Sequence, residues 1–535
     1  MLKNNVPSPN ARLMVHRPIN AARRLISLAL LLLVAGGLLV LGGLPVPAMA
    51  DTAVASGSHP SAREILHRLS EGVTRITLDN GLRVLLFKRE QAPIFTGHIW
   101  VRVGGVDERP GTTGVAHLLE HMAFKGSTTI GTKDFDREQE LLKRFDALMH
   151  RADSGEDDAD LRAELDTLEK QLEELWVENE FSELYQKRGA VGLNAATGKD
   201  YTYYMVSLPN VDFQLWAWLE SDRLLNPVFR QFYKEREVVM EERRMRTDDN
   251  PAGKMYEALL ATAFWSHPNR LPVIGWPSDL RRLHVSDIEE LYASYYRPDN
   301  MVIALVGDLD PATVRPVLEK YFGRLKAPQD PVPQIITQEE RQQGERTAIV
   351  RFDAEPMVAL AFHKPVYPQK DDLYFAVVHS LLSEGRSSLL YRELVQKQQL
   401  ATSISTSEAP GELYPSLFYV WASPRAGVTN ETLIAAIQAQ LDRLKTEPVS
   451  QADLDAAKKR VRVEMLNSMD SNDGLARTLA HAEVLWGNWE VLFDMYDSIL
   501  ATTAEDVRRL ANEYFRIDNR TVVKLEKPVP QEDVQ

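Results

Sequence analysis

The chain has 535 residues, of which 44% are hydrophobic and 26% are charged, so it is long enough to bury the cores of two or more domains. Its formal net charge of -14 argues against a nucleic-acid-binding protein, because no basic surplus is available to neutralise phosphates. It has no cysteine, so any metal ion must be held by histidine and carboxylate side chains, and no disulfide contributes to stability.

The N-terminal 50 residues carry five basic residues, no acidic one, and an apolar run over residues 25–44. The Ala-Met-Ala sequence at 48–50 has the small residues that a signal peptidase reads. We therefore predict a signal peptide over residues 1–50, cleaved between Ala50 and Asp51, and an exported, periplasmic protein. Two alternatives stay open: an uncleaved membrane anchor, for which the run is long enough, and a mitochondrial presequence, against which the continuous apolar run argues.

Strand and helix patterns alternate along the rest of the chain. Residues 73–87 predict two strands around an Asp-Asn-Gly turn at 79–81, and residues 95–105 predict a third strand. Two apolar segments play the same part in the second half, at 347–353 and 357–365. Helices are predicted at 211–225, 235–246, 451–471 and 503–515. This mixture indicates an α+β fold with a mainly antiparallel sheet covered by helices in each domain.

The second half repeats part of the first. The 19 residues from Asp287 and the 19 residues from Asp506 align without a gap, with six identities, and both predict a helix, an Asp-Asn turn and an apolar strand. A chance match of a common motif is the alternative, but we favour a duplicated domain. The predicted divisions are a lead at 51–73, a first domain at 74–324, a Pro-rich linker at 325–345, a second domain at 346–528 and a tail at 529–535.

One segment, about residues 136–187, does not belong to the repeated pattern. It is densely charged, and after a Ser-Gly turn its leucines recur at spacings of four and three residues, from Leu161 to Leu175. We predict an inserted antiparallel helical hairpin whose narrow apolar stripe packs on its own first arm. It is either a surface embellishment or an arm that docks a partner subunit.

The stretch GVAHLLEHMAFKG, residues 114–126, has the residue types of a metal site. His117 and His121 are four residues apart, so a helix directs both toward one ion, with Glu120 beside them. This is the HxxEH arrangement of a zinc hydrolase. A catalytic zinc needs a third protein ligand, and Glu235 and Glu242 lie two turns apart on one face of another predicted helix. Without the His motif, that second helix would be read as an ordinary solvated one.

Four motifs in order resemble a known family, the pitrilysin or insulinase zinc endopeptidases, and most closely its processing-peptidase-like members with two domains per chain. They are HLLEHMAFKG, GLNAATGKDYTYY, EREVVMEERR and YYRPDNMVIALVGDLDP. The resemblance covers residues 74–311, and the duplicated half extends it to about Lys527.

The resemblance implies a role for each matching residue. It implies that His117, His121 and Glu242 bind Zn2+ and that Glu120 is the general base, with Glu235 as an auxiliary catalytic acid. It also implies that Asn194 and Ala195 lie on an edge strand that binds the substrate backbone.

The chain departs from the family pattern at two places. The 121 residues from His121 to Glu242 exceed the usual spacing by about the length of the predicted hairpin, which accounts for the difference. In the second domain, Val395 and Thr402 stand where many relatives have an Arg and a Tyr that contact substrate, and the nearby Arg392 is out of register. Substrate stabilisation from that domain is therefore in doubt.

The second domain also lacks the metal motif. Ala376, His379 and Ser380 stand at the positions of the HxxEH residues, so we expect one zinc ion per chain. His379 is expected to be structural.

The predicted function is zinc-dependent hydrolysis of peptides or unfolded protein segments by attack of zinc-bound water, with Glu120 as general base. The resemblance further implies that two such chains enclose a peptide, either as a homodimer or as a heterodimer with a related subunit that lacks the metal motif. The alternative is a noncatalytic peptide-binding or assembly subunit. No nucleic acid is expected as a partner, and a membrane is expected only if the N-terminal segment is not cleaved.

Overall fold

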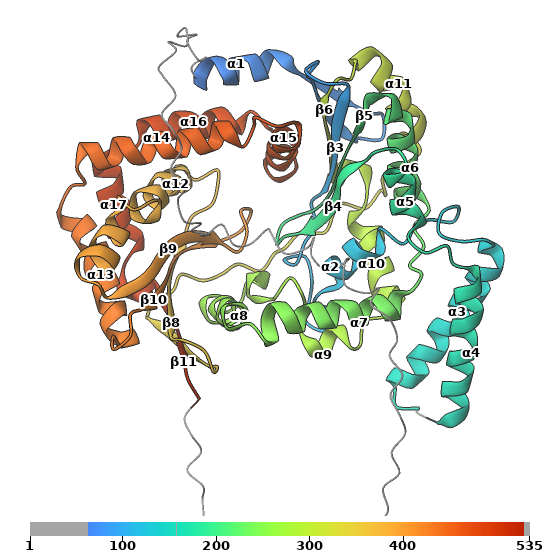
Figure 1. Ribbon diagram of the computed structural model, residues 1–535, viewed down its shortest axis with the longest axis horizontal. Coiled ribbons are helices and arrows are strands. Elements are labelled where there is room, and N and C mark those ends of the chain that lie inside the picture. The colour runs from blue at the N-terminus through green and yellow to red at the C-terminus, as the bar shows by residue number, and fades with distance from the viewer. Residues whose placement is uncertain (1–61, 157, 529–535) are drawn as a thin grey trace, which may run out of the picture. The chain divides into compact units, whose positions relative to one another are not determined.

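The computed structural model describes residues 62–156 and 158–528 (Figure 1). The predicted signal peptide at 1–50 and the predicted tail at 529–535 lie outside the described residues. None of the helices in the described part of the chain has both the length and the apolar character needed to cross a membrane.

The first sheet has six strands in the order β1-β2-β6-β3-β5-β4. β1 and β2 are antiparallel across the predicted turn, where Gly81 has a φ of 89 that a side chain would disfavour. β2 and β6 are parallel, and the other neighbours are antiparallel. The strands are β1 Val73–Thr77, β2 Arg83–Lys88, β3 Ile94–Val101, β4 Val191–Thr197, β5 Thr202–Pro209 and β6 Met301–Gly307.

The second sheet has five strands in the order β7-β11-β8-β10-β9. Its one parallel pair is β7 and β11, and its other pairs are antiparallel, so it repeats the β2-β6-β3-β5-β4 part of the first sheet. The strands are β7 Arg346–Arg351, β8 Met357–Lys364, β9 Ala401–Ala409, β10 Ser416–Pro424 and β11 Arg520–Glu526. The predicted α+β fold with two duplicated sheets is confirmed.

The first half of the chain contains the helices α1 to α11. They are α1 Ala62–Gly72, α2 Val115–Met122, α3 Phe135–Asp153, α4 Ala159–Leu175, α5 Glu180–Gln186, α6 Phe213–Leu225, α7 Phe232–Arg243, α8 Pro251–Ala263, α9 Pro277–Leu280, α10 Val285–Tyr295 and α11 Pro311–Phe322. Those of the second half are α12 Lys370–Ser383, α13 Asn430–Thr446, α14 Gln451–Asn467, α15 Asn472–Trp486, α16 Val491–Ala501 and α17 Ala504–Tyr514.

Several helix ends differ from the predicted ones by one to four residues, and two of them have a clear local reason. α7 begins at Phe232 rather than residue 235, because Gln231 before it has a φ of 60 that no helix continues through. α14 ends at Asn467 rather than residue 471, because the side chain of Ser471 accepts a hydrogen bond from the Gly474 amide and starts α15.

Within the segment that interrupts the repeat, α3 and α4 lie side by side (Figure 1). Their contact is a narrow apolar stripe that includes Leu148, Leu161 and Leu168. Asp134 and Asp158 cap the two helices by accepting hydrogen bonds from the backbone amides of the first turns.

Each half of the chain lends one helix to the sheet of the other half (Figure 1). α8 packs on β7, β8 and β11 of the second sheet, with Leu259 in a cluster that contains Ala359 and Val523. α15 packs on β3 and β6 of the first sheet, with Leu479 in a cluster that contains Trp100. The two exchanged helices follow α7 and α14, at equivalent places in the repeat. The two halves are therefore joined by two apolar interfaces as well as by the linker.

Candidate metal centre

Helix α2 places the two His residues of the HxxEH motif. It begins after Gly114, whose φ of 90 and close approach to the backbone of Ile274 exclude a side chain. Glu108 accepts hydrogen bonds from the Gly114 and Ala116 amides, both 2.8 Å long, and so satisfies free donors at the helix start. Burial raises the pKa of Glu108 to about 8, against the effect of these two amides. The apolar face of α2 is buried in the main core, which fixes the direction of its polar face.

Helix α7 brings Glu242 to this polar face. Oε2 of Glu242 lies 3.6 Å from Nε2 of His117 and 3.5 Å from Nε2 of His121. This oxygen is buried and has no hydrogen-bond partner. The other oxygen, Oε1, pairs with the Arg246 guanidinium at 2.8 Å, which aims Oε2 at the two imidazoles. The structure therefore brings together the three residues that the sequence analysis predicts as zinc ligands.

The donor set fits a zinc ion. The three side chains offer two imidazole nitrogens and one carboxylate oxygen within 4.8 Å of one another. Zinc binds such atoms at about 2.0–2.2 Å, and a tetrahedral arrangement then separates two ligand atoms by about 3.3 Å, close to the separations found here. A buried carboxylate oxygen without a donor is costly unless a cation satisfies it.

Charge and burial set the protonation of the two His residues. Burial above all, and then the charges of His121 and Arg246, lower the pKa of His117 to about 3, so its imidazole is neutral as a ligand must be. Burial alone would lower the pKa of His121, but the hydrogen bond to Glu235 and nearby carboxylates raise it overall.

Glu235 contacts His121, one of the three candidate metal ligands, and is not itself one of them. Its Oε1 lies 3.1 Å from Nδ1 of His121, and its Oε2 lies 2.6 Å from Nζ of Lys125. Burial opposes ionisation of Glu235, but these two hydrogen bonds lower its pKa to about 2. A carboxylate on Nδ1 leaves Nε2 for the metal and makes the imidazole a better ligand.

Glu120 is held by the edge strand. The Thr197 hydroxyl at the end of β4 donates a 2.6 Å hydrogen bond to Oε2 of Glu120. Burial raises the pKa of Glu120, and the Thr197 hydrogen bond partly opposes this. The side chain is only partly buried, so the carboxylate remains accessible beside the two His residues.

Asn194 and Ala195 lie on β4, the last strand of the first sheet. They pair with Met205 and Tyr204 of β5, and no strand in the described part of the chain pairs with the other edge of β4. Asn194 is exposed and Ala195 is half-buried. Their strand reaches the candidate metal centre through Thr197, two residues farther on.

Four supporting residues were not predicted from the sequence: Glu108, Lys125, Thr197 and Arg246. Arg246 follows Glu242 by four residues, so helical spacing could have found it. Lys125 lies beyond the end of α2 and pairs with Glu235 on α7, so this spacing does not identify it. Thr197 and Glu108 come from segments distant in sequence, and no local pattern marks them.

The second half has no matching triplet among its described residues. Nδ1 of His379 lies 2.7 Å from the Thr406 hydroxyl on β9, and its Nε2 lies 3.6 Å from Glu384. Two residues at or near the positions where many relatives have a substrate-contacting Arg and Tyr also make ordinary contacts. Arg392 pairs with Asp453 at 3.3 Å, and the Thr402 hydroxyl donates to the Ser423 carbonyl.

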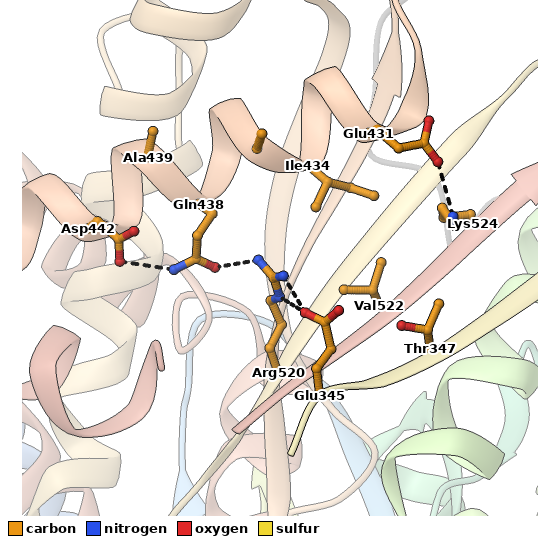
Figure 2. Close-up of a pocket in the computed structure, with 11 residues that line it drawn as sticks. Glu345, Thr347, Glu431, Ile434, Gln438, Ala439, Asp442, Arg520, Val522 and Lys524 are labelled. Carbon is orange, nitrogen blue, oxygen red and sulfur yellow. Dashed lines mark hydrogen bonds and ion pairs between the residues drawn. The ribbon is translucent and has the colours of Figure 1, made fainter. Parts of the chain in front are cut away.

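A cavity of about 470 Å³ lies elsewhere, between α13 and the strands β7 and β11 of the second sheet (Figure 2). Four of the charged side chains that line it are paired with one another, Arg520 with Glu345 and Lys524 with Glu431, and Asp442 accepts a hydrogen bond from Gln438. It contains none of the residues of the candidate metal centre.

Comparison with known proteins decides the family. The sequence pattern described as Insulinase (Peptidase family M16) matches residues 83–144, and that described as Peptidase M16 inactive domain matches residues 282–461. The zinc protease PqqE of Helicobacter pylori is 30% identical over 456 residues, covering 84% of this chain and 92% of that protein. The chain belongs to the insulinase family of peptidases, M16.

Other M16 relatives extend the likeness over the same length. A probable mitochondrial-processing peptidase subunit beta of Arabidopsis thaliana is 24% identical over 471 residues, covering 85% of this chain and 79% of that protein. The crystal structure of a protease from Helicobacter pylori superposes with a TM-score of 0.73 at 27% identity, covering 85% of this chain and 99% of that one. The predicted resemblance is confirmed, and several M16 relatives are named zinc proteases.

Proposed function

We propose that this protein is a zinc-dependent endopeptidase that hydrolyses peptides or unfolded protein segments. His117, His121 and Glu242 are its zinc ligands in this proposal, and Glu120 is its general base. The observation that carries the proposal is the buried Oε2 atom of Glu242, which accepts no hydrogen bond and faces the Nε2 atoms of both His residues.

The surrounding residues supply the protein's part of the chemistry. A zinc ion, when bound, lowers the pKa of a water ligand toward about 7 and stabilises negative charge on a peptide carbonyl oxygen. Glu120 accepts a proton from the attacking water and returns it to the leaving amine. Burial raises the pKa of this carboxylate, which makes it a stronger proton acceptor than an exposed carboxylate.

Two residues position others in this scheme. Thr197 fixes the orientation of the Glu120 carboxylate through its 2.6 Å hydrogen bond. Glu235, predicted as an auxiliary catalytic acid, acts through His121: its contact with Nδ1 fixes the ring orientation and leaves Nε2 to face Glu242.

The substrate is proposed to bind as an added strand on β4. Asn194 and Ala195 lie on its unpaired edge, and Thr197 links the same strand to Glu120. Strand addition uses main-chain hydrogen bonds, so it favours extended, unfolded segments and places little demand on their side chains.

We further propose that the protein is exported to the periplasm after cleavage at Ala50, with a membrane-anchored form as the alternative. For assembly we propose a homodimer, or a heterodimer with a related subunit without the metal motif. The name of the Arabidopsis relative, a subunit beta, supports a paired arrangement. Residues 74–324 form the catalytic domain in this proposal and residues 346–528 the noncatalytic one.

The second candidate is a noncatalytic peptide-binding or assembly subunit. It is favoured by the match of residues 282–461 to a domain described as inactive. That match leaves out the HxxEH helix and Glu242, and the chain retains both. Catalysis is therefore the better supported function.

The test is metal analysis of the purified protein, with cleavage of a quenched peptide library in the presence and absence of a chelator. Glu120→Gln should keep zinc at the centre and lose hydrolysis, whereas His117→Ala should lose both. Equal activity of Glu120→Gln and the unmodified protein would contradict the assignment. Absence of zinc and of turnover, also after mixing with a candidate partner subunit, would favour the noncatalytic role.

A further inference from the structure

A second group of metal-binding side chains lies where the inserted hairpin meets the first domain. Asp146 and His150 are four residues apart on α3 and lie on one face of it. His284 comes from the main body, at the residue before α10. Each side chain offers a ligand atom, and these atoms lie within 4.8 Å of one another. None of the three belongs to the HxxEH centre.

The neighbours of this group orient it as a binding site would require. The Tyr233 hydroxyl donates to Asp146, and its oxygen lies 3.1 Å from Nδ1 of His284. Since the one hydroxyl proton goes to Asp146, Nδ1 of His284 must donate to Tyr233, which leaves Nε2 with a free lone pair. A tyrosine therefore fixes the tautomer of one candidate ligand while it holds another, which is the role of supporting residues at metal sites.

An ordinary ion pair does not account for the arrangement. The His150 and His284 rings stack with their centroids 3.6 Å apart and their planes 16° apart, a distance that two imidazolium cations avoid. Burial, and then the neighbouring His150, lower the pKa of His284 against the opposing effect of Asp153 and Asp146, which favours the neutral ring that a metal ligand needs. Asp153 also faces His284, with Oδ2 3.7 Å from Nε2, but that oxygen is already paired with Arg236 at 3.1 Å.

We propose that Asp146, His150 and His284 bind a second divalent transition-metal ion, with Zn2+ as its representative, which cross-links the hairpin to the first domain. Two imidazoles and one carboxylate suit Zn2+ and its neighbours in the transition series and do not suit Ca2+ or Mg2+, which prefer oxygen ligands alone. His150 is 46% exposed, so an ion has a path from solvent, and water can complete the coordination.

Binding requires one side-chain movement. Stacked rings direct their lone pairs side by side rather than at one point, so one ring must turn to share an ion with the other. His150 is free to turn, because its only polar contact among the described residues is Asp146, 3.6 Å away on the same helix. His284 stays fixed by Tyr233.

The cross-link would act on the helix that carries Glu242. Tyr233 and Arg236, which hold Asp146 and Asp153 of α3, both belong to α7. On the same helix, Glu242 faces the Nε2 atoms of both His residues of the HxxEH motif, and Glu235 contacts His121. An ion that fixes α3 against the start of α10 therefore also restrains α7, which is bonded to α3 through Tyr233 and Arg236.

The experiment measures zinc content of the full chain after dialysis against Zn2+ buffered at about 1 μM. The unmodified protein should hold two ions per chain, and His150→Ala should hold one. His67→Ala, which removes another exposed His from α1, is the matched control and should still hold two. The His117→Ala/His121→Ala variant should keep one ion, and adding His150→Ala to it should leave none.

Thermal unfolding supplies a second readout that does not depend on activity. Added Zn2+ should raise the Tm of the His117→Ala/His121→Ala variant and leave that of the triple variant unchanged. The inference is overturned if the His117→Ala/His121→Ala variant binds no zinc and its Tm does not move, or if His150→Ala removes no ion. Loss of the ion at the HxxEH centre alone would instead count against the proposed peptidase function, so the two failures are distinguishable.

Discussion

The hydrogen bond from Thr197 to Glu120 gives the sharpest test of the proposed catalytic arrangement. Thr197→Val keeps the shape of the side chain and its β-branch in β4 but removes the 2.6 Å donor to Oε2 of Glu120. The carboxylate then loses the contact that fixes its orientation and opposes the rise of its pKa. No candidate metal ligand is touched by the change.

The size of the effect follows from the kind of hydrogen bond that is lost. A hydrogen bond to a charged group in a partly buried site contributes about 1.5–3 kcal/mol. If that contribution acts in the transition state, kcat/KM should fall by about 10–150-fold, since each 1.36 kcal/mol is tenfold. Glu120→Gln removes the proton acceptor itself and should cost more, about 100–10,000-fold.

The assay is a double-mutant cycle on a quenched peptide substrate, with zinc content measured for every variant. Thr197→Val should have no further effect when Glu120 is already Gln, because Thr197 acts through that residue. Thr197→Ser retains the hydroxyl and should recover most of the activity. The reasoning fails if Thr197→Val is as active as the unmodified protein, or if it lowers the residual rate of Glu120→Gln by the same factor.

Three further changes test other parts of the structure. Arg246→Gln removes the ion pair that aims Glu242, so zinc affinity measured by chelator competition should fall by about 10–100-fold, while Arg244→Gln, an exposed pair on the same helix turn, should leave it unchanged. Burial lowers the pKa of His267 to about 4. As the pH falls, the unfolded chain therefore binds a proton at this residue before the folded protein does. The folded protein should lose about 2 kcal/mol of stability from this residue between pH 7.5 and pH 5.0. Urea unfolding at the two pH values should show this loss reduced in His267→Asn, and an unchanged loss would refute it. Glu483→Gln leaves two arginines of the first sheet without their buried carboxylate and should destabilise the protein by about 2–4 kcal/mol in the same assay; a change below 1 kcal/mol would show that α15 does not need this contact.

Local sequence signals were enough to predict the strands and the duplication of the domain. The turn at Gly81 and the apolar alternation on both sides of it fixed β1 and β2, and the repeated Asp-Asn turn at 299–300 placed a matching strand in each half. The exchange of α8 and α15 between the sheets left no such signal. Both helices have an apolar face, but an apolar face does not state which sheet will cover it.

For the candidate site, the sequence predicted which residues share a face of a single helix. His117 and His121 share a face of α2 by spacing alone, as do Glu235 and Glu242 on α7. That the two helices meet followed only from the family resemblance, because no spacing rule links residues 121 positions apart. Thr197 could not be predicted, since its contact with Glu120 depends on the register of β4 against β5 and on the packing of α2 beside that strand.

The second half shows that this packing does not depend on the metal site. His379 on α12 contacts Thr406 on β9 at 2.7 Å, as Glu120 on α2 contacts Thr197 on β4 at 2.6 Å. The sequence separation is 27 residues in one pair and 77 in the other, and the additional 50 residues run through α3 and α4. A helix held against an edge strand by a threonine is thus the repeated frame, and the hairpin was accommodated without disturbing it. The His pair and Glu242 are what the first half adds to that frame, which is why the geometry of the threonine contact alone cannot identify a metal centre.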